Sequence, residues 1–478
     1  MSENELKAMI DKIVNQKTEF QNIEVKSAHN GCTEKLYDTL SGFSNQDDGG
    51  TIVFGIDEKQ GFKVVGVYDA QDLQKKVSEQ CKTMQPEVRA VFTVTEYLGK
   101  IVVSAEIPPV DITDRPCFYA GKGRLKGAYI RVGDSDEPMN EYEVYSYEAY
   151  RKKYQDDIRI VENAAEESLD INAISNYILK LKLNKPNLAK LDDEKIIALM
   201  NILKDGKPTL FSELLFGLYP QAYFPQLSVI AISVPGTDIG ETDSDGSRFN
   251  DNKRIEGTIP EMLDAALLFV RNNMKTKTII DSNTGKRTDK PEYPVNAVRE
   301  AVLNALVHRD YSIHTEGMPI QILMFSDRME IKNPGGLYGR LTVDTIGKIQ
   351  ADTRNPALAI ALEVLSITEN RYSGIPTIRR EMKEAGLPEP EFIDRRGEFT
   401  VIFRKQAAVS ENNRFDESSL MRFCAMPRTK HEIADFLGIK SVSYALGKYI
   451  KPLIEEGKIK MLIPEVPSSP NQKYFSAD

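Results

Sequence analysis

Three carboxylates in the first sixty residues could bind a hard divalent cation together. Glu19 and Glu24 stand five residues apart, and Asp57 follows the apolar run Thr51–Gly55. Mg²⁺ and Mn²⁺ prefer oxygen ligands and accept phosphate oxygens beside them, which is the chemistry of metal-assisted phosphodiester cleavage. Because the chain contains 71 Asp and Glu residues, the same spacing also fits ordinary surface charge.

A second set of polar residues falls on one face of the helix expected over residues 295–311. At about 100° per residue, Glu300, Asn304 and His308 share one stripe. A Glu and an Asn one turn apart are what an ATP site would use, because the carboxylate can activate water and the amide oxygen can bind Mg²⁺. The alternative is the plain polar face of an amphipathic helix. The opposite face is apolar, with Val295, Val298, Val302 and Leu306.

A third set combines cations with aromatic rings in the first third of the chain. Cations contact phosphates and aromatic rings contact bases, so such a set is typical of nucleic-acid binding. A solvated hairpin with ordinary lysines is the alternative interpretation. The cations are Lys122, Arg124, Lys126 and Arg131, and the rings beside them are Phe118 and Tyr119.

Composition limits the partners and the compartment. The chain has 478 residues with 62 Lys and Arg against 71 Asp and Glu, a net charge of −9. Any nucleic-acid binding must therefore come from local patches. Four cysteines without a CxxC pair and four histidines disfavour a disulfide framework and a zinc site. With no apolar run of about 20 residues and a polar N-terminus, we expect a cytoplasmic protein without a membrane partner.

The elements that must position these residues predict an α+β multidomain fold. Residues 1–155 form the first domain, with a helix over Glu5–Val14 and an aromatic-rich helix over Tyr142–Tyr154. Alternating apolar residues predict its strands. These strands are Thr51–Ile56, Lys63–Val67, Ala90–Tyr97, Ile101–Ile107 and Ala128–Val132, with a hairpin turn at Leu98-Gly99-Lys100.

The middle of the chain predicts a central α/β region. Residues 156–290 supply connecting helices and its first part, and residues 291–405 supply the rest. A break at 184–186 divides a helical stretch over 168–205. The elements expected after it are strands 227–233, 320–325, 328–332 and 399–404, a loop over 235–252, and helices 261–275, 295–311, 341–366 and 376–385. Residues 406–419 have the composition of a linker.

Residues 420–478 predict a winged helix-turn-helix. A helix over Thr429–Leu437, a turn at Gly438, a helix over Lys440–Glu456 and a β-hairpin follow in that order. In such a module the second helix enters the major groove of double-stranded DNA; protein contact or dimerisation is the alternative use. The expected base contacts are Lys440, Ser441, Ser443 and Tyr444, and the expected phosphate contacts are Lys448 and Lys451.

The first domain resembles the Schlafen-type AlbA-like domain over residues 15–145. The motifs are Glu19-x4-Glu24-x-Lys26, the stretch from Phe43 to Asp57, and Tyr129-Ile130-Arg131-Val132-Gly133. This resemblance implies a nucleic-acid-associated domain. In Schlafen proteins it also implies a three-carboxylate endoribonuclease site, with Glu19, Glu24 and Asp57 as the metal ligands here. The usual Asn-Thr-x-Gly-Gly is one residue longer in this chain, from Asn45 to Gly50.

Residues 205–405 resemble the ATP-binding-like C-terminal domain of RecG-like, Schlafen-domain bacterial proteins. The helix around Asn304 resembles the N-box of the gyrase, Hsp90 and histidine-kinase ATPases. Further marks of the resemblance are His308-Arg309-Asp310-Tyr311-Ser312, Asn333-Pro334-Gly335-Gly336, Thr353-Arg354-Asn355-Pro356 and Ser373-Gly374-Ile375.

This second resemblance implies a site for ATP or another nucleotide. Glu300 would be catalytic in an ATPase, and Asn304 would bind Mg²⁺ or Mn²⁺. Two departures predict binding rather than efficient hydrolysis: Asn333 replaces the Asp of Asp-x-Gly-x-Gly, and Tyr372-Ser373-Gly374-Ile375 has lost one glycine. The implied cofactor-binding residues are Glu300, Asn304, His308, Asn333, Gly335, Gly336, Ser373 and Gly374.

These observations favour a DNA-binding transcriptional regulator whose ATPase-like central domain senses a nucleotide or another ligand. Paired half-sites on DNA would suit a homo-oligomer. The alternative is an enzyme, a metal-dependent endonuclease acting on RNA or DNA and gated by the central domain. A motor helicase is disfavoured because the chain lacks a Gly-x4-Gly-Lys-[Ser/Thr] loop.

Overall fold

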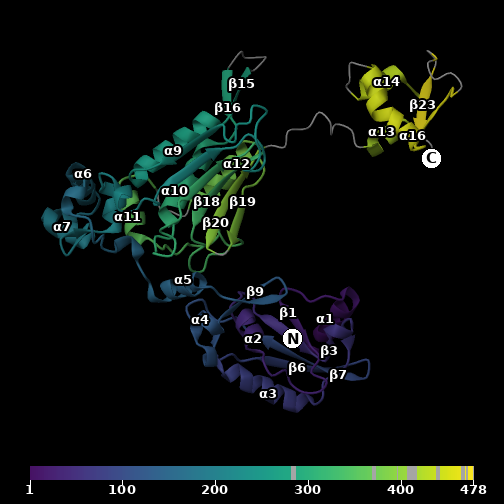
Figure 1. Cartoon of the computed structure of the whole chain (residues 1–478), viewed down its shortest axis with the longest axis horizontal. Helices are drawn as coiled ribbons and strands as arrows, with labels where there is room; N and C mark the ends of the chain where they lie inside the picture. Colours follow the sequence, from purple (N-terminus) through teal and green to yellow (C-terminus); the bar gives the residue numbers. More distant parts are fainter. Residues whose placement is uncertain are drawn as a thin grey trace. The chain divides into compact units, whose positions relative to one another are not determined.

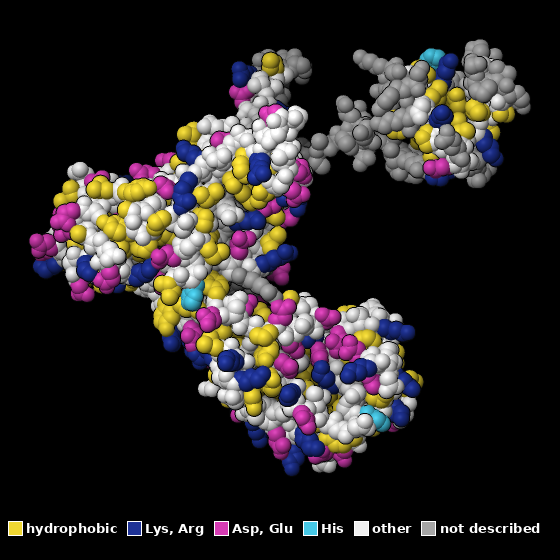
Figure 2. All heavy atoms as spheres, viewed as in Figure 1, with side chains coloured by type: hydrophobic (Ala, Val, Ile, Leu, Met, Phe, Trp, Pro, Cys, Tyr) yellow, Lys and Arg dark blue, Asp and Glu magenta, His cyan; other side chains and the backbone are white. Residues whose placement is uncertain are grey.

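The chain forms two compact units, Met1–Phe403 and Arg404–Asp478, in a computed structural model (Figure 1). The structure describes all residues except 281–286, 369–372, 396, 406–416, 438–441, 465–468, 470–471 and 477–478. No helix among the described residues combines the length and the apolar character needed to cross a membrane. On the face shown in Figure 2, acidic and basic side chains are interspersed rather than separated into large fields.

A four-stranded sheet organises the N-terminal part of the first unit. Its order is β1 (Ile23–Lys26), β2 (Gly50–Phe54), β7 (Lys100–Ile107) and β6 (Val91–Tyr97), with β1 parallel to β2 and the other pairs antiparallel. The β6–β7 hairpin turns at Leu98 and Gly99, which both have positive φ, as the sequence signal there predicts.

Helices cover both faces of this sheet, because successive strand side chains point to opposite sides. Val53 and Val102 belong to a core shared with α1 (Glu3–Gln16), whereas Ile52 and Val103 face α2 (Tyr37–Ser44) and α3 (Ala70–Lys82). Shorter elements complete this part. They are β3 (Ile56–Asp57), β4 (Lys63–Val64), β5 (Met84–Gln85), β8 (Phe118–Tyr119), α4 (Arg124–Gly127), β9 (Tyr129–Val132), β10 (Ser135–Pro138) and α5 (Glu141–Lys152).

A six-stranded sheet organises the central part of the first unit. Its order is β14 (Asp251–Ile255), β13 (Val229–Ser233), β17 (Ile320–Met324), β18 (Arg328–Pro334), β20 (Glu398–Arg404) and β19 (Glu391–Arg395). Three helices pack over this sheet (Figure 1). They are α9 (Ile259–Asn273), α10 (Val295–His308) and α12 (Gly374–Glu384). As the sequence pattern predicts, α10 buries Val298, Val302 and Leu306.

One hydrophobic core extends from Val161 to Phe403, so residues 156–290 and 291–405 do not have separate cores. It includes the helices α6 (Ile171–Asn184), α7 (Asp193–Leu199), α8 (Leu210–Phe216) and α11 (Pro356–Val364). The helix expected over 341–366 exists only as α11. The segment before α11 is not helical. The side-chain amide of Asn355 donates to the carbonyl oxygens of Val307 and Arg309, at 2.8 and 2.7 Å, and holds this segment against the C-terminal end of α10.

The second unit contains short helices and a three-stranded sheet. The helices are α13 (Glu417–Phe423), α14 (Lys430–Phe436), α15 (Val442–Ala445), a π-helical turn (Leu446–Ile450) and α16 (Lys451–Glu455). The strands β21 (Arg428–Thr429), β23 (Lys473–Ser476) and β22 (Ile459–Met461) are neighbours in that order. Leu420, Ile433, Ala445 and Tyr474 are among the buried residues of its own core.

Candidate functional site

A cavity of about 1300 Å³ lies between α10, α12 and the central sheet. Helix α10 supplies five of its polar residues, the turn after β18 supplies another group, and the start of α12 closes one side. All eight residues expected to bind a nucleotide line this cavity. They are Glu300, Asn304, His308, Asn333, Gly335, Gly336, Ser373 and Gly374.

At one end of the cavity, the first residue of α12 lies against α10. A Cβ added to Gly374 would come within 2.9 Å of Asn304 Nδ2 and 3.3 Å of Glu300 Oε2. Glu300 also accepts a hydrogen bond from Arg299 Nη1 at 3.1 Å. A side chain at position 374 would meet the end of the Asn304 side chain, so α12 begins directly against the two residues expected to bind Mg²⁺ and to activate water.

At the sheet side of the cavity, Asn333 is a buried amide in an apolar setting. Its exposed fraction is 6%, and no donor among the described residues hydrogen-bonds its Oδ1 atom. Ile331, Phe399 and Val401 line the cavity beside it. An unsatisfied buried acceptor costs about 1–3 kcal/mol, so a ligand donor that reaches this atom would gain binding energy.

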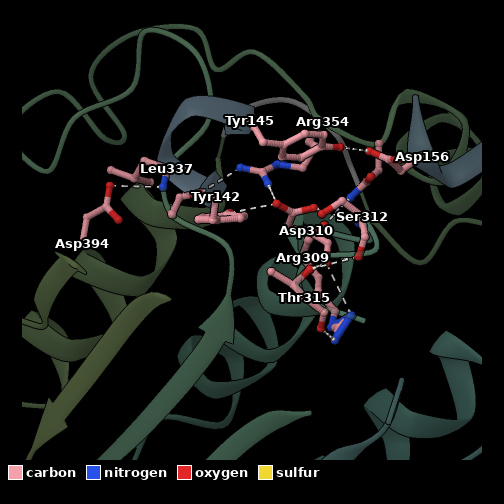
Figure 3. A network of polar contacts seen from close by, with 12 residues as sticks. Tyr142, Tyr145, Asp156, Arg309, Asp310, Ser312, Thr315, Leu337, Arg354 and Asp394 are labelled. Carbon is pink, nitrogen blue, oxygen red and sulfur yellow. Dashed lines mark hydrogen bonds and ion pairs between the residues drawn. The ribbon is translucent and has the colours of Figure 1, made fainter. Parts of the chain in front are cut away.

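The wall of the cavity beyond Gly336 is held by a buried ion pair (Figure 3). Arg354 pairs with Asp310, donates to the carbonyl oxygen of Gly336 at 3.2 Å, and lies over the Tyr338 ring. Asp310 also accepts from Ser312 N and from the hydroxyl of Tyr142, each at 2.8 Å. Although burial alone would raise the pKa of Asp310, Arg354 and these hydrogen bonds lower it below its usual value.

Sequence reasoning missed the role of this wall. Its residues belong to two quoted motifs, Asp310 in the stretch after α10 and Arg354 before α11, and no local pattern indicates that the two motifs meet. His308 opens onto the same cavity. Two causes lower the pKa of His308 to about 4. The larger is desolvation by the surrounding protein, and the smaller is the positive charge of Arg354. At neutral pH the imidazole is therefore uncharged and can accept a hydrogen bond.

In the N-terminal part, two of the three expected metal-binding carboxylates lie together around a buried cation. Glu24 Oε2 pairs with Arg131 Nη1 at 2.8 Å, and Glu24 also pairs with Lys26. Arg131 reaches Asp136 at 3.2 Å and Glu19 at 4.0 Å. Burial is the main cause that raises the pKa of Glu19 to about 7, and the negative charge of Glu24 adds to it.

The third expected carboxylate has a different role in this structure. Asp57 caps the 3-10 turn Glu58–Gln60, where it accepts from Lys59 N at 3.0 Å and from Gln60 Nε2 at 2.8 Å. Among the residues that the structure describes, no three or more His, Cys, Asp or Glu side chains are arranged to hold a metal ion. The structure thus brings Glu19 and Glu24 together and leaves Asp57 as a cap.

Only part of the expected basic patch can meet a partner. Lys122 is exposed and donates to the hydroxyls of Tyr37 at 2.7 Å and Tyr129 at 3.4 Å, and Lys126 is exposed as well. Arg131 is buried in the ion cluster. Arg124 is half-buried and paired with Glu148 of α5.

In the second unit, the structure describes one of the six expected DNA contacts in full. Lys451 is exposed at the start of α16. Two others, Lys440 and Ser441, lie outside the described residues, and so do the side chains of Ser443, Tyr444 and Lys448.

Three segments of the chain match known protein families. Residues 19–140 match "Schlafen, AlbA_2", residues 317–403 match "Putative ATP-dependent DNA helicase recG C-terminal", and residues 418–475 match "Filamentation induced by cAMP protein Fic-like, C-terminal domain". The chain therefore carries a Schlafen AlbA_2 region and a RecG C-terminal-like region in a mixed α/β multidomain fold. No curated protein matches the chain.

The solved structures that are similar to the chain include the following two. The DIP2311 protein from Corynebacterium diphtheriae is 16% identical, over 98% of this chain and 96% of that chain, with a TM-score of 0.41. The N-terminal domain of a RecG-related protein from Nitrosomonas europaea is 26% identical, over 27% of this chain and 90% of that chain, with a TM-score of 0.23.

Proposed function

We propose that this chain, which carries a Schlafen AlbA_2 region and a RecG C-terminal-like region, is a nucleic-acid-binding regulator whose central cavity senses a nucleotide. The observation that carries the proposal is the cavity itself, because all eight residues expected to bind a nucleotide line one space of about 1300 Å³. Ligand sites are concave and carry convergent polar groups, and this cavity is lined by polar and apolar residues in similar measure.

The residues of the cavity fit a purine nucleotide such as ATP. The buried Oδ1 of Asn333 can accept a hydrogen bond from an exocyclic amino group, and the apolar side chains beside it can cover a base. The N-terminus of α12 offers an anion the backbone N–H groups of Gly374 and Ile375. The next two positions add none, because Pro376 has no N–H and Thr377 N donates to the carbonyl oxygen of Ser373. Cations that line the same cavity and can neutralise phosphates are Lys185, Arg299 and Arg380.

The contact between Gly374 and Asn304 favours sensing over hydrolysis. Asn304 and Glu300 are the residues that would bind Mg²⁺ and activate water, and α12 begins directly against both side chains. His308 is uncharged at neutral pH and stays available as a hydrogen-bond partner. A nucleotide bound here would supply binding energy that moves α12, without a chemical step in this arrangement.

Two surfaces support nucleic acid as the partner, and we propose double-stranded DNA. The first is the exposed pair Lys122 and Lys126 in the Schlafen AlbA_2 region. The second is the C-terminal unit, whose helices and sheet order β21-β23-β22 suit a winged helix. Residues 425–460 contain seven Lys and Arg against four Asp and Glu. A homo-oligomer would present two such units to paired half-sites.

The ion cluster around Arg131 favours a regulator over the alternative endonuclease. Glu24 already satisfies two cations, and Asp57 is engaged as a helix cap. A metal ion that used these carboxylates would have to displace Arg131 from a site where the side chain is only 1% exposed.

The nucleotide proposal is tested by calorimetric titration of ATP in the presence of Mg²⁺. We expect wild type to bind ATP and Asn333→Ala to bind it about three- to tenfold more weakly, the usual effect of one lost hydrogen bond. Asn172→Ala changes an exposed Asn of α6 and is the matched control, with wild-type affinity expected. Absence of ATP binding by wild type would refute the proposal, and equal affinities would remove Asn333 from it.

A further inference from the structure

Helix α5 contacts both the cavity wall and the segment 120–127, which carries the exposed Lys122 and Lys126. We propose that α5 couples ligand binding in the cavity to nucleic-acid binding at Lys122 and Lys126. The inference rests on the proposed function, since it needs both ligands. It assigns to α5 the role of transmitting binding at one site to the other.

One face of α5 holds the cavity wall through two tyrosine hydroxyls. Tyr142 donates to Asp310 at 2.8 Å, as Figure 3 shows, and Tyr150 donates to Asp352 at 3.0 Å. The Tyr150 ring also meets the Tyr338 ring edge-on, with centroids 5.4 Å apart. Asp352 and Tyr338 both line the cavity, so these tyrosines reach its residues directly.

Arg354 joins the cavity to the first of these contacts. It lines the cavity, donates to the Gly336 carbonyl oxygen and pairs with Asp310, to which Tyr142 is bound. Gly335 packs closely against Asp310, since a Cβ on Gly335 would lie 2.5 Å from Asp310 Cβ. The φ of Gly335, +100°, also suits only glycine. A ligand that draws on Arg354 or on the turn at Gly336 must therefore disturb Asp310 and, through it, Tyr142.

The opposite face of α5 holds the element that carries the lysines. Val144 and Tyr147 pack with Phe118 and Ala128, which flank that element. Glu148 pairs with Arg124, which lies two residues from both Lys122 and Lys126. At about 100° per residue, Tyr142 and Tyr150 lie on one side of the helix and Val144 and Glu148 on the other, with Tyr147 between Tyr150 and Val144.

The helix is built to move as one body. At its N-terminus, the side chain of Asn140 accepts from Glu143 N, and Glu143 accepts from Asn140 N, both at 2.8 Å. At its C-terminus, Lys153 takes the left-handed conformation that ends a helix, with φ 53°. Because both ends are capped, a displacement at Tyr142 is carried to Glu148 rather than absorbed by fraying.

The test is the DNA affinity of the full chain with and without saturating ATP, measured by fluorescence anisotropy of a labelled duplex. Coupled sites typically change each other's affinity by about fivefold or more, and the change is reciprocal. We expect such a change in wild type and a change below about twofold in the double variant Tyr142→Phe, Tyr150→Phe. The separate affinities of that variant for ATP and for DNA are measured first, so that ATP is saturating for each protein.

Tyr97→Phe is the matched control, because it removes a tyrosine–aspartate hydrogen bond, to Asp11, far from α5 in sequence and outside its contacts. It should keep the full ATP effect. The inference is overturned if wild type binds both ligands without mutual effect, or if the double variant keeps the full effect. If wild type fails to bind ATP or DNA at all, the proposed function falls first and the inference falls with it.

Discussion

Arg131 is the residue whose role differs most from the sequence-based expectation. The sequence places it in a basic run and predicts a phosphate contact, but its guanidinium is buried and paired with Glu24 and Asp136. The strand register explains this, since Arg131 on β9 is directly opposite Asp136 on β10. Asp136 has no motif of its own, so nothing local predicts a buried cluster of these charges.

Arg131→Ala should destabilise the protein strongly, because it leaves the mostly buried Asp136 without its cation and Glu24 with Lys26 alone. Breaking such a cluster costs about 3–5 kcal/mol. Lys126→Ala removes an exposed cation of the same run and is expected to stay within about 0.5 kcal/mol of wild type. Unfolding in urea measures both values. Equal stability of the two variants would contradict the buried role of Arg131.

Glu19 should make stability depend on pH. Burial raises its pKa in the folded protein from 4.5 to about 7, so between these values the folded chain keeps a proton that the unfolded chain has lost. Its contribution is therefore fully present below pH 4.5 and is lost as the pH rises through about 7. We expect Glu19→Gln to gain stability relative to wild type as the pH rises across this range.

Urea unfolding of wild type and Glu19→Gln at the two ends of this pH range gives the relevant difference. The exposed Glu34 provides the matched control variant Glu34→Gln, which removes a carboxylate outside the buried cluster. A difference for Glu19→Gln that is independent of pH would show that burial does not act on this carboxylate as described.

At the scale of elements, the sequence predicts those with a strong local pattern. Helix α10 follows from its amphipathic stripe, and the β6–β7 hairpin follows from alternation and the turn at Leu98-Gly99. Helix α3 was missed although signals exist: Asp69 caps it, and Leu73, Val77 and Cys81 are buried at four-residue spacing. That stripe is narrow, and the rest of the helix is polar.

The candidate site also has one part that local sequence patterns predict and one part that they do not. Its eight cavity residues could be named from motifs, because each motif is a short run with its own local geometry. The wall that connects the cavity to α5 could not, since Tyr142, Asp310 and Arg354 meet across 168 and 44 residues of sequence. The motif also does not indicate that the Asp57 side chain caps the turn that follows β3.

At the scale of the whole molecule, the distribution of charge limits how the chain can bind nucleic acid. A net charge of −9 disfavours broad, nonspecific attraction to nucleic acid. The exposed lysines at 122 and 126 and the net positive segment 425–460 are local exceptions. Binding through a few such phosphate contacts should weaken as salt is added.

One gel tests the account most directly. Labelled duplex DNA, single-stranded DNA and structured RNA are each incubated with the full chain and Mn²⁺, beside Glu24→Ala. We predict intact nucleic acid and a shifted band for duplex DNA that weakens with added salt, in wild type and in the variant alike. Cleavage by wild type that is absent in Glu24→Ala would contradict the account and establish an endonuclease that depends on Glu24.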